Sequence, residues 1–116
     1  MTTDLIGFLR ARLAEDEEMA RAADSELSTV FIRIASFDPE MAADERHIMR
    51  HDPARVLREV EANRALLDEY ASVAVNDLPR GGYEYATGWA TGLGFAVRCA
   101  ASVYADHPDY LEEWRP

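Results

Sequence analysis

Two histidines, His47 and His51, have the spacing in this sequence that best suits a chemical role. They are four residues apart, so on a helix both imidazoles lie on one face, a common arrangement for two ligands of one metal ion. Further ligands are available from Asp44 one turn earlier, or from Cys99 or His107 if the fold brings them close. The alternative is that both histidines occupy the last turn of a helix, where partial positive charge suits the helix dipole. A divalent metal at His47 and His51 is therefore one hypothesis, and no other cofactor is predicted.

His107 lies beside Asp106 and Asp109, a combination that can support acid–base chemistry. The structural interpretation is favoured, in which Asp106 or His107 caps a turn that Pro108 begins. Cys99 lies in an apolar segment, which predicts a small buried hydrophobe rather than a nucleophile. The sequence contains no Ser-His-Asp spacing, phosphate loop or dinucleotide fingerprint, so no catalytic residue is predicted.

The charge balance limits the classes of partner. The chain has 22 acidic and 12 basic residues, a net charge of −10, which repels phosphate backbones and predicts no nucleic-acid binding. The acidic run at residues 15–18 is interpreted as a solvated helix face. The alternative is that the protein is an acidic inhibitor that mimics nucleic acid.

Length and composition indicate one domain, residues 1–116, in the cytoplasm. The length of 116 residues suits one core, and the single cysteine and lack of a secretory leader favour the cytoplasm. The longest uncharged window, Tyr85 to Val97, is 13 residues, too short to cross a bilayer as a helix. No membrane partner is predicted.

The elements that must position these residues are helices. A first heptad ladder consists of Leu9, Leu13, Asp16, Ala20, Ala23, Leu27, Val30 and Ile34, which share one helical face. The helix that carries it is expected to begin at Thr3 or Asp4. A second ladder consists of Val56, Val60, Asn63, Leu67, Tyr70 and Ala74. Asn63 is either a buried amide that fixes helix register or a residue at the rim of the core.

Two Asp-Pro pairs predict the beginnings of helices, because each places a capping carboxylate before a proline suited to the first helical position. Asp38-Pro39 predicts a helix of about 13 residues that ends near His51, and Asp52-Pro53 a long helix to about Val75. Residues 76–82 are expected to form a loop.

Residues 29–34 are open to two interpretations, because their composition suits a strand while their spacing continues the first ladder. The helix is favoured, since no second strand-like run exists to pair with this one. A restart at Asp24 or Ser25 would divide the long helix in two.

The last long helix is predicted over about residues 83–105 and is expected to be mostly buried, because its apolar residues surround most of the axis. Its interior glycines, Gly88, Gly92 and Gly94, predict close approach by other helices. After it, Tyr110, Leu111 and Trp114 are expected to dock on the helices as an ordered tail. The predicted fold is an all-α helical bundle of four main helices, with long coiled-coil-like first and third helices and an ordered aromatic C-terminal tail.

Three stretches resemble a family of short actinobacterial and phage proteins of unknown function: FLRARLAEDE, HDPARVLREVEANR and YADHPDYLEEWRP. They span the opening helix, the long middle helix and the tail. Members of that family typically carry a longer variable segment, often with a Gly-Pro-Trp element, between the first two stretches. This chain has a short segment there without the element. The resemblance implies no activity.

A continuous helix from Asp4 to Ser36 would be about 50 Å long, which is too long for a compact monomer of this size. Its far end would expose Leu27, Val30, Phe31 and Ile34, and a second copy of the chain is the economical cover for them. The leading hypothesis is therefore a non-enzymatic helical interaction protein, a homodimer with an unidentified protein partner. The alternatives are the metal-binding protein or metalloenzyme at His47 and His51, and the acidic inhibitor.

Overall fold

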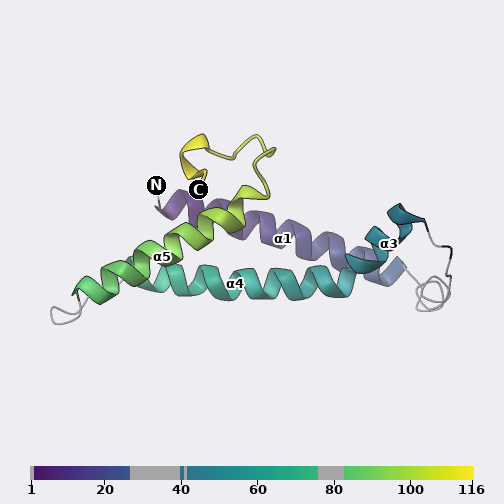
Figure 1. The fold of residues 1–116 in the computed structure, drawn as a ribbon, viewed down its shortest axis with the longest axis horizontal. Helices are drawn as coiled ribbons and strands as arrows, with labels where there is room; N and C mark the ends of the chain where they lie inside the picture. The colour runs from purple at the N-terminus through teal and green to yellow at the C-terminus, as the bar shows by residue number, and fades with distance from the viewer. Residues whose placement is uncertain (1, 27–39, 41, 76–82) are drawn as a thin grey trace. The chain divides into compact units, whose positions relative to one another are not determined.

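Helices account for all of the regular structure in the part of the chain that the structure describes (Figure 1). The computed structural model describes residues 2–26, 40, 42–75 and 83–116. These residues form α1 (Thr2–Glu26), α3 (Ala43–Arg50), α4 (Pro53–Val75) and α5 (Tyr83–Ser102), followed by a 3₁₀ turn, η2 (Glu112–Trp114). No strand occurs among them, which confirms the all-α prediction. Leu27, Val30, Phe31 and Ile34 lie outside the described residues, so their predicted interface stays a prediction.

The predicted beginning of the long middle helix is confirmed. Helix α4 begins at Pro53, and Oδ1 of Asp52 accepts the backbone N–H of Arg55 at 2.8 Å. This carboxylate satisfies one of the amides that a helix leaves without an internal partner in its first turn.

The preceding helix is shorter than predicted. Helix α3 begins at Ala43, since Ala42 before it has an extended backbone, with φ −67° and ψ 159°. The predicted start at Asp38-Pro39 lies outside the described residues. Asp44 and Glu45 lie in its first turn, where negative charge suits the helix dipole. It ends at Arg50, next to the predicted end at His51.

The described residues belong to two compact units, residues 1–13 with 62–116 and residues 14–61. The core of the first unit contains the fully buried Leu67 of α4. The other buried apolar residues of this unit are Leu5, Phe8, Leu9, Leu13, Val97, Ala101 and Trp114. Arg10 on α1 forms an ion pair with Asp68 on α4 at 3.0 Å. The described leucines of the two ladders, Leu9, Leu13 and Leu67, therefore lie in the core, as their spacing predicts.

Gly94 allows α5 to pack closely against Tyr70 of α4, because glycine has no side chain. A Cβ atom at Gly94 would lie 3.3 Å from Cε1 of Tyr70 on α4, closer than ordinary van der Waals contact. The prediction that α5 is mostly buried is wrong, because Trp89 and Phe95 are 47% and 52% exposed. The buried side of α5 carries Val97 and Ala101 instead.

The C-terminal tail is ordered, and its main anchor is Trp114. The indole is 5% exposed, and its ring centroid lies 5.0 Å from that of Phe8 on α1. Leu111, by contrast, is 42% exposed, so its predicted docking is wrong. Beside the anchor, Arg115 donates hydrogen bonds to the carboxylate of Glu112, which lower the pKa of Glu112.

The second unit joins the later part of α1, helix α3 and the first turns of α4. Ala20, Pro53 and Val60 are its buried apolar residues. Arg55 links α3 to α4, since its Nη1 donates to the carbonyl of Arg50 at 3.3 Å. The same arginine forms an ion pair with Glu59, at 3.0 Å.

None of the described helices combines the length and the apolar content needed to cross a bilayer.

Candidate functional site

An open groove of about 450 Å³ lies within the unit of residues 14–61. Its lining comes from α1, α3, the residues between α3 and α4, and α4: Asp16, Met19, Ala20, Ala23, Ile48, His51, Pro53, Val56 and Glu59. Six of these nine residues are apolar. Such a concave apolar surface suits an apolar side chain of a binding partner.

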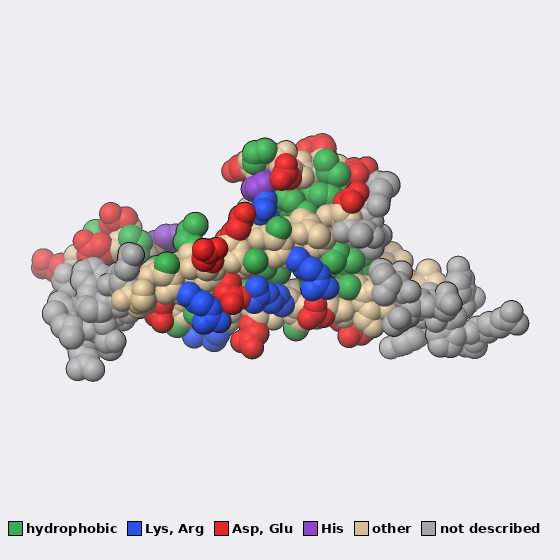
Figure 2. Space-filling view, turned by 180° about the vertical axis from the view of Figure 1, so that it is seen from behind, with side chains coloured by type: hydrophobic (Ala, Val, Ile, Leu, Met, Phe, Trp, Pro, Cys, Tyr) green, Lys and Arg blue, Asp and Glu red, His purple; other side chains and the backbone are tan. Residues whose placement is uncertain are grey.

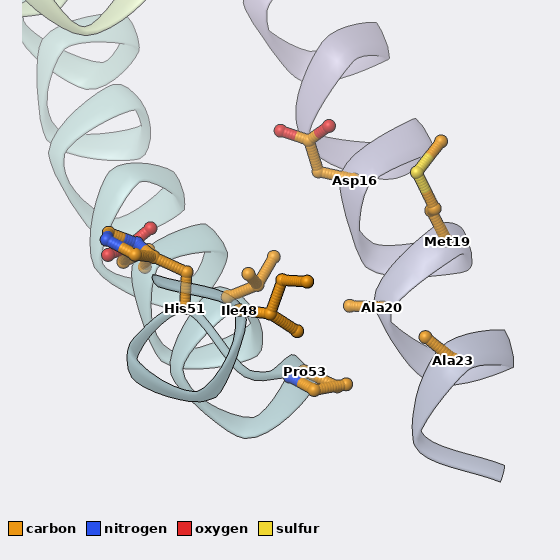
Figure 3. A pocket seen from close by; sticks show the side chains of 9 residues that line it. Asp16, Met19, Ala20, Ala23, Ile48, His51 and Pro53 are labelled. Atoms are coloured by element: carbon orange, nitrogen blue, oxygen red, sulfur yellow. The ribbon is translucent and has the colours of Figure 1, made fainter. Parts of the chain in front are cut away.

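The small residues of α1 make the hollow. Ile48 and Pro53 face Ala20 and Ala23 across the groove (Figure 3). Alanine side chains leave space that larger residues at these ladder positions would fill. The groove therefore follows from the change from leucine to alanine along the first ladder.

Two large apolar side chains at this groove are exposed to solvent. Met19 is 72% exposed and Ile48 is 58% exposed. Both lie among charged residues on their helices. Because their side chains are exposed, they do not belong to the core. An exposed apolar patch with a polar rim is a frequent mark of a protein-binding surface.

The rim of the groove is acidic. Asp16 and Glu59 line it, and residues 14–61 hold 13 of the 22 acidic residues but six of the 12 arginines. The local field therefore favours a partner that brings positive charge.

His47 and His51 are neighbours, as their spacing predicts. Their ring centroids are 4.6 Å apart with an interplanar angle of 34°, and both residues are exposed. His51 ends the helix, and its backbone N–H donates to the carbonyl of His47 at 3.0 Å. Among the described residues no group of three or more His, Cys, Asp or Glu side chains is placed to hold a metal ion. Within the unit of residues 14–61, the structure thus brings the two imidazoles together without adding Asp44 to them.

His107 belongs to an aromatic cluster in the other unit. Its Nδ1 accepts the backbone N–H of Asp109 at 3.0 Å, which confirms that it caps the turn around Pro108. Arg12 contacts both ring nitrogens, with Nη1 2.9 Å from Nδ1, and its guanidinium lies 5.3 Å from the ring centroid of Phe8. The acid–base interpretation of His107 receives no support from these contacts, because the imidazole serves the turn and the packing of the tail.

A second hollow of about 450 Å³ lies beside this cluster. Its lining combines α1 with the tail: Asp4, Gly7, Phe8, Ala11, Arg12, Asp109, Leu111 and Trp114. Figure 2 shows hydrophobic side chains gathered where the tail meets the helices beneath it. Its charged residues are of both signs, so this hollow favours no one class of ligand.

Cys99 and Asn63 have surroundings that bear on their predicted roles. Cys99 is exposed, so the prediction of a buried cysteine is wrong. Asn63 is half-buried, which places it at the rim of the core rather than at its centre.

The chain matches a protein-family model over almost its whole length. Residues 2–116 match the model of the Family of unknown function (DUF6221), and the chain belongs to this family. No curated protein matches the chain. No solved structure matches it.

Sequence reasoning predicted the two histidines but missed the groove beside them. The available signal was the pair Met19 and Ile48, two large apolar residues among charged neighbours. A pattern of this kind does not show whether a core covers such residues, so the three-dimensional structure was needed.

Proposed function

We propose that this protein is a non-enzymatic helical interaction protein. Its partner binds in the groove whose lining includes Met19, Ala20, Ile48 and Pro53. The observation that supports the proposal best is the exposure of Met19 and Ile48 beside an apolar hollow. The protein is also proposed to form a homodimer.

The groove suits a helical or extended segment that brings an apolar side chain flanked by lysine or arginine. The apolar side chain would enter between Ala20 and Pro53, where its burial stabilises the complex. The basic flanks would pair with Asp16 and Glu59 at the rim. Charged pairs at a rim steer association more than they add affinity, so the apolar contact is expected to supply most of the binding free energy.

The double substitution Met19→Arg/Ile48→Arg tests this proposal. It removes the two exposed apolar side chains and adds positive charge that repels a basic partner. The measurement is affinity capture from the native cell type with quantitative mass spectrometry. We expect the captured amount of a partner that binds the natural chain to fall about tenfold or more, which corresponds to a loss of at least about 1.4 kcal/mol of binding free energy. Because both positions are exposed, the melting temperature is expected to stay within about 2 °C of the natural chain.

A matched control lies on α3, where Arg46→Ala changes an exposed residue that does not line the groove. This variant should capture the same partner as the natural chain. Capture that is unchanged by Met19→Arg/Ile48→Arg would contradict binding in the groove. Repeating the capture at increasing salt concentration distinguishes groove binding from the alternative of an acidic inhibitor, because a purely electrostatic complex dissociates as ionic strength rises.

Metal binding at His47 and His51 is a second candidate function, favoured by the adjacent exposed imidazoles. Titration of untagged protein with Zn²⁺ in a calorimeter is expected to give one site per chain if these rings form the centre of a site. The His47→Ala/His51→Ala variant should lose that site completely, while His107→Ala retains it. Equal zinc binding by the natural chain and the double variant would exclude the pair as ligands.

A further inference from the structure

The outward side of α5 forms an apolar surface that the core does not use. We infer that this surface binds a second copy of the chain through the same surface of that copy. It is called the α5 face here and consists of Gly88, Trp89, Gly92, Phe95, Ala96 and Cys99 of α5, together with Val103 directly after the helix. This inference rests on the homodimer proposed above and names its contact, which lies in a different part of the chain from the groove and does not depend on it.

Exposure separates the α5 face from the core side of the helix. Trp89, Phe95 and Val103 are 47%, 52% and 77% exposed, whereas Val97 and Ala101 on the other side are fully buried. At 100° per residue the α5 face covers about a third of the helix circumference. Large apolar residues are thus gathered on one solvent-facing stripe of a helix whose other side already packs in the core.

The glycines of the α5 face, Gly88 and Gly92, have no packing role among the described residues. A Cβ atom added at Gly88 or Gly92 would meet no neighbouring atom within 4 Å, in contrast to Gly94, which lies against Tyr70. Glycine is the least favourable residue in a helix interior except proline. Two such residues on one exposed stripe are explained if another helix approaches their backbone closely.

The α5 face is self-complementary in shape, because it carries projections and hollows together. Trp89 and Phe95 expose large side chains on it, while Gly88 and Gly92 expose backbone without a side chain beside them. A two-fold symmetric dimer joins the same patch on both subunits, so each patch must provide both features. The ridges of one helix can then occupy the grooves of the other.

Charge also favours a second copy as the occupant. Each chain has a net charge of −10, so two copies repel one another wherever their acidic surfaces meet. The sequence from Tyr85 to Val97 has no charged residue. The charge beside the α5 face is positive, because the guanidinium of Arg98 lies 5.8 Å from the ring centroid of Phe95. A basic partner is therefore repelled here and is better served by the acidic rim of the groove, whereas the acidic surface of a second copy is not repelled by Arg98.

The size of the α5 face predicts a weak dimer. A fully buried aromatic side chain covers about 150–250 Å², so the half-exposed Trp89 and Phe95 together offer roughly 200 Å² per copy. With Val103 and the small residues the contact reaches roughly 300–400 Å² per copy, below the ~800 Å² per partner of a typical stable interface. The dimer should therefore dissociate in the micromolar range or above.

Sedimentation velocity on the full chain, over concentrations from micromolar to millimolar, tests the inference. The natural chain should shift from its 13.0 kDa monomer toward twice that mass as concentration rises. Phe95→Glu should stay monomeric throughout, because it places two carboxylates in the contact. Thr91→Glu is the matched control, since it adds the same charge to an exposed residue of α5 outside the α5 face. This control should dimerise like the natural chain.

Two further measurements keep the result decisive. Cys99 lies on the α5 face, so its reaction with N-ethylmaleimide in the natural chain should slow severalfold at concentrations where the dimer forms. Phe31→Glu examines the segment of residues 27–34 as a different contact. A natural chain that stays monomeric at every concentration overturns the inference. So does a dimer that Phe31→Glu abolishes while Phe95→Glu leaves it intact. The groove variant Met19→Arg/Ile48→Arg should still dimerise, so loss of partner binding and loss of the dimer are distinguishable.

Discussion

Replacement of Trp114 by alanine is expected to lower the free energy of unfolding by about 3–5 kcal/mol. The indole is 5% exposed and packs against the rings of Phe8 and Tyr110, at centroid distances of 5.0 and 5.7 Å. Domains of this size have a total stability of about 5–15 kcal/mol, so the loss is a large fraction of it. Urea denaturation followed by circular dichroism should show the change, and the melting temperature should fall by roughly 10–20 °C.

Two variants show that packing of this one side chain is responsible. Leu111→Ala removes a residue of the same tail that is 42% exposed, and it should cost about 1 kcal/mol or less. Trp114→Phe retains an aromatic ring and loses no hydrogen bond within the described residues, since Nε1 of Trp114 has no partner there. It should fall between the natural chain and the alanine variant. Equal stability of Trp114→Ala and the natural chain would show that the tail does not anchor the fold.

Replacement of Leu67 by alanine is expected to cost about 2–5 kcal/mol. Leu67 is fully buried in the core of the first unit, so its removal forfeits the transfer free energy of the side chain and leaves a cavity. In urea denaturation, the urea concentration at which half of the protein is unfolded should fall. The slope of the unfolding free energy against urea concentration should stay the same, because the surface exposed on unfolding is nearly unchanged.

The neighbouring Leu66 provides the control for helix propensity. Leu66→Ala makes the same chemical change on α4 at a half-buried position and should cost clearly less than Leu67→Ala. Equal costs at both positions would contradict the burial of the second ladder, because a difference in buried area is the only reason to separate them.

The packing of Trp114 against Phe8 brings together two distant parts of the chain. Phe8 lies near the beginning of the chain and Trp114 near its end, and their contact closes the unit formed by residues 1–13 and 62–116. Contacts so distant in sequence carry a cost in loop-closure entropy, which the burial of the Phe8 and Trp114 rings helps to offset. The tail thus belongs to the core.

Much of the fold follows from local rules that can be applied to the sequence alone. Asp52 and Pro53 determine where α4 begins, because a capping carboxylate and a proline with a fixed φ angle act within one helical turn. The spacing of Leu9 and Leu13 indicates which side of α1 is buried, since residues three and four apart share a face. The aromatic residues of the tail predict that it is ordered, and the burial of Trp114 confirms this.

The sequence determined that α5 is apolar, but only the tertiary structure decided which apolar side is covered. Val97 is fully buried and Phe95 is half exposed, although both are apolar and two residues apart on the same helix. The groove was decided in the same way, because its lining residues come from separate helices. Burial depends on contacts between distant segments, whereas helix spacing reports only the residues within a few turns.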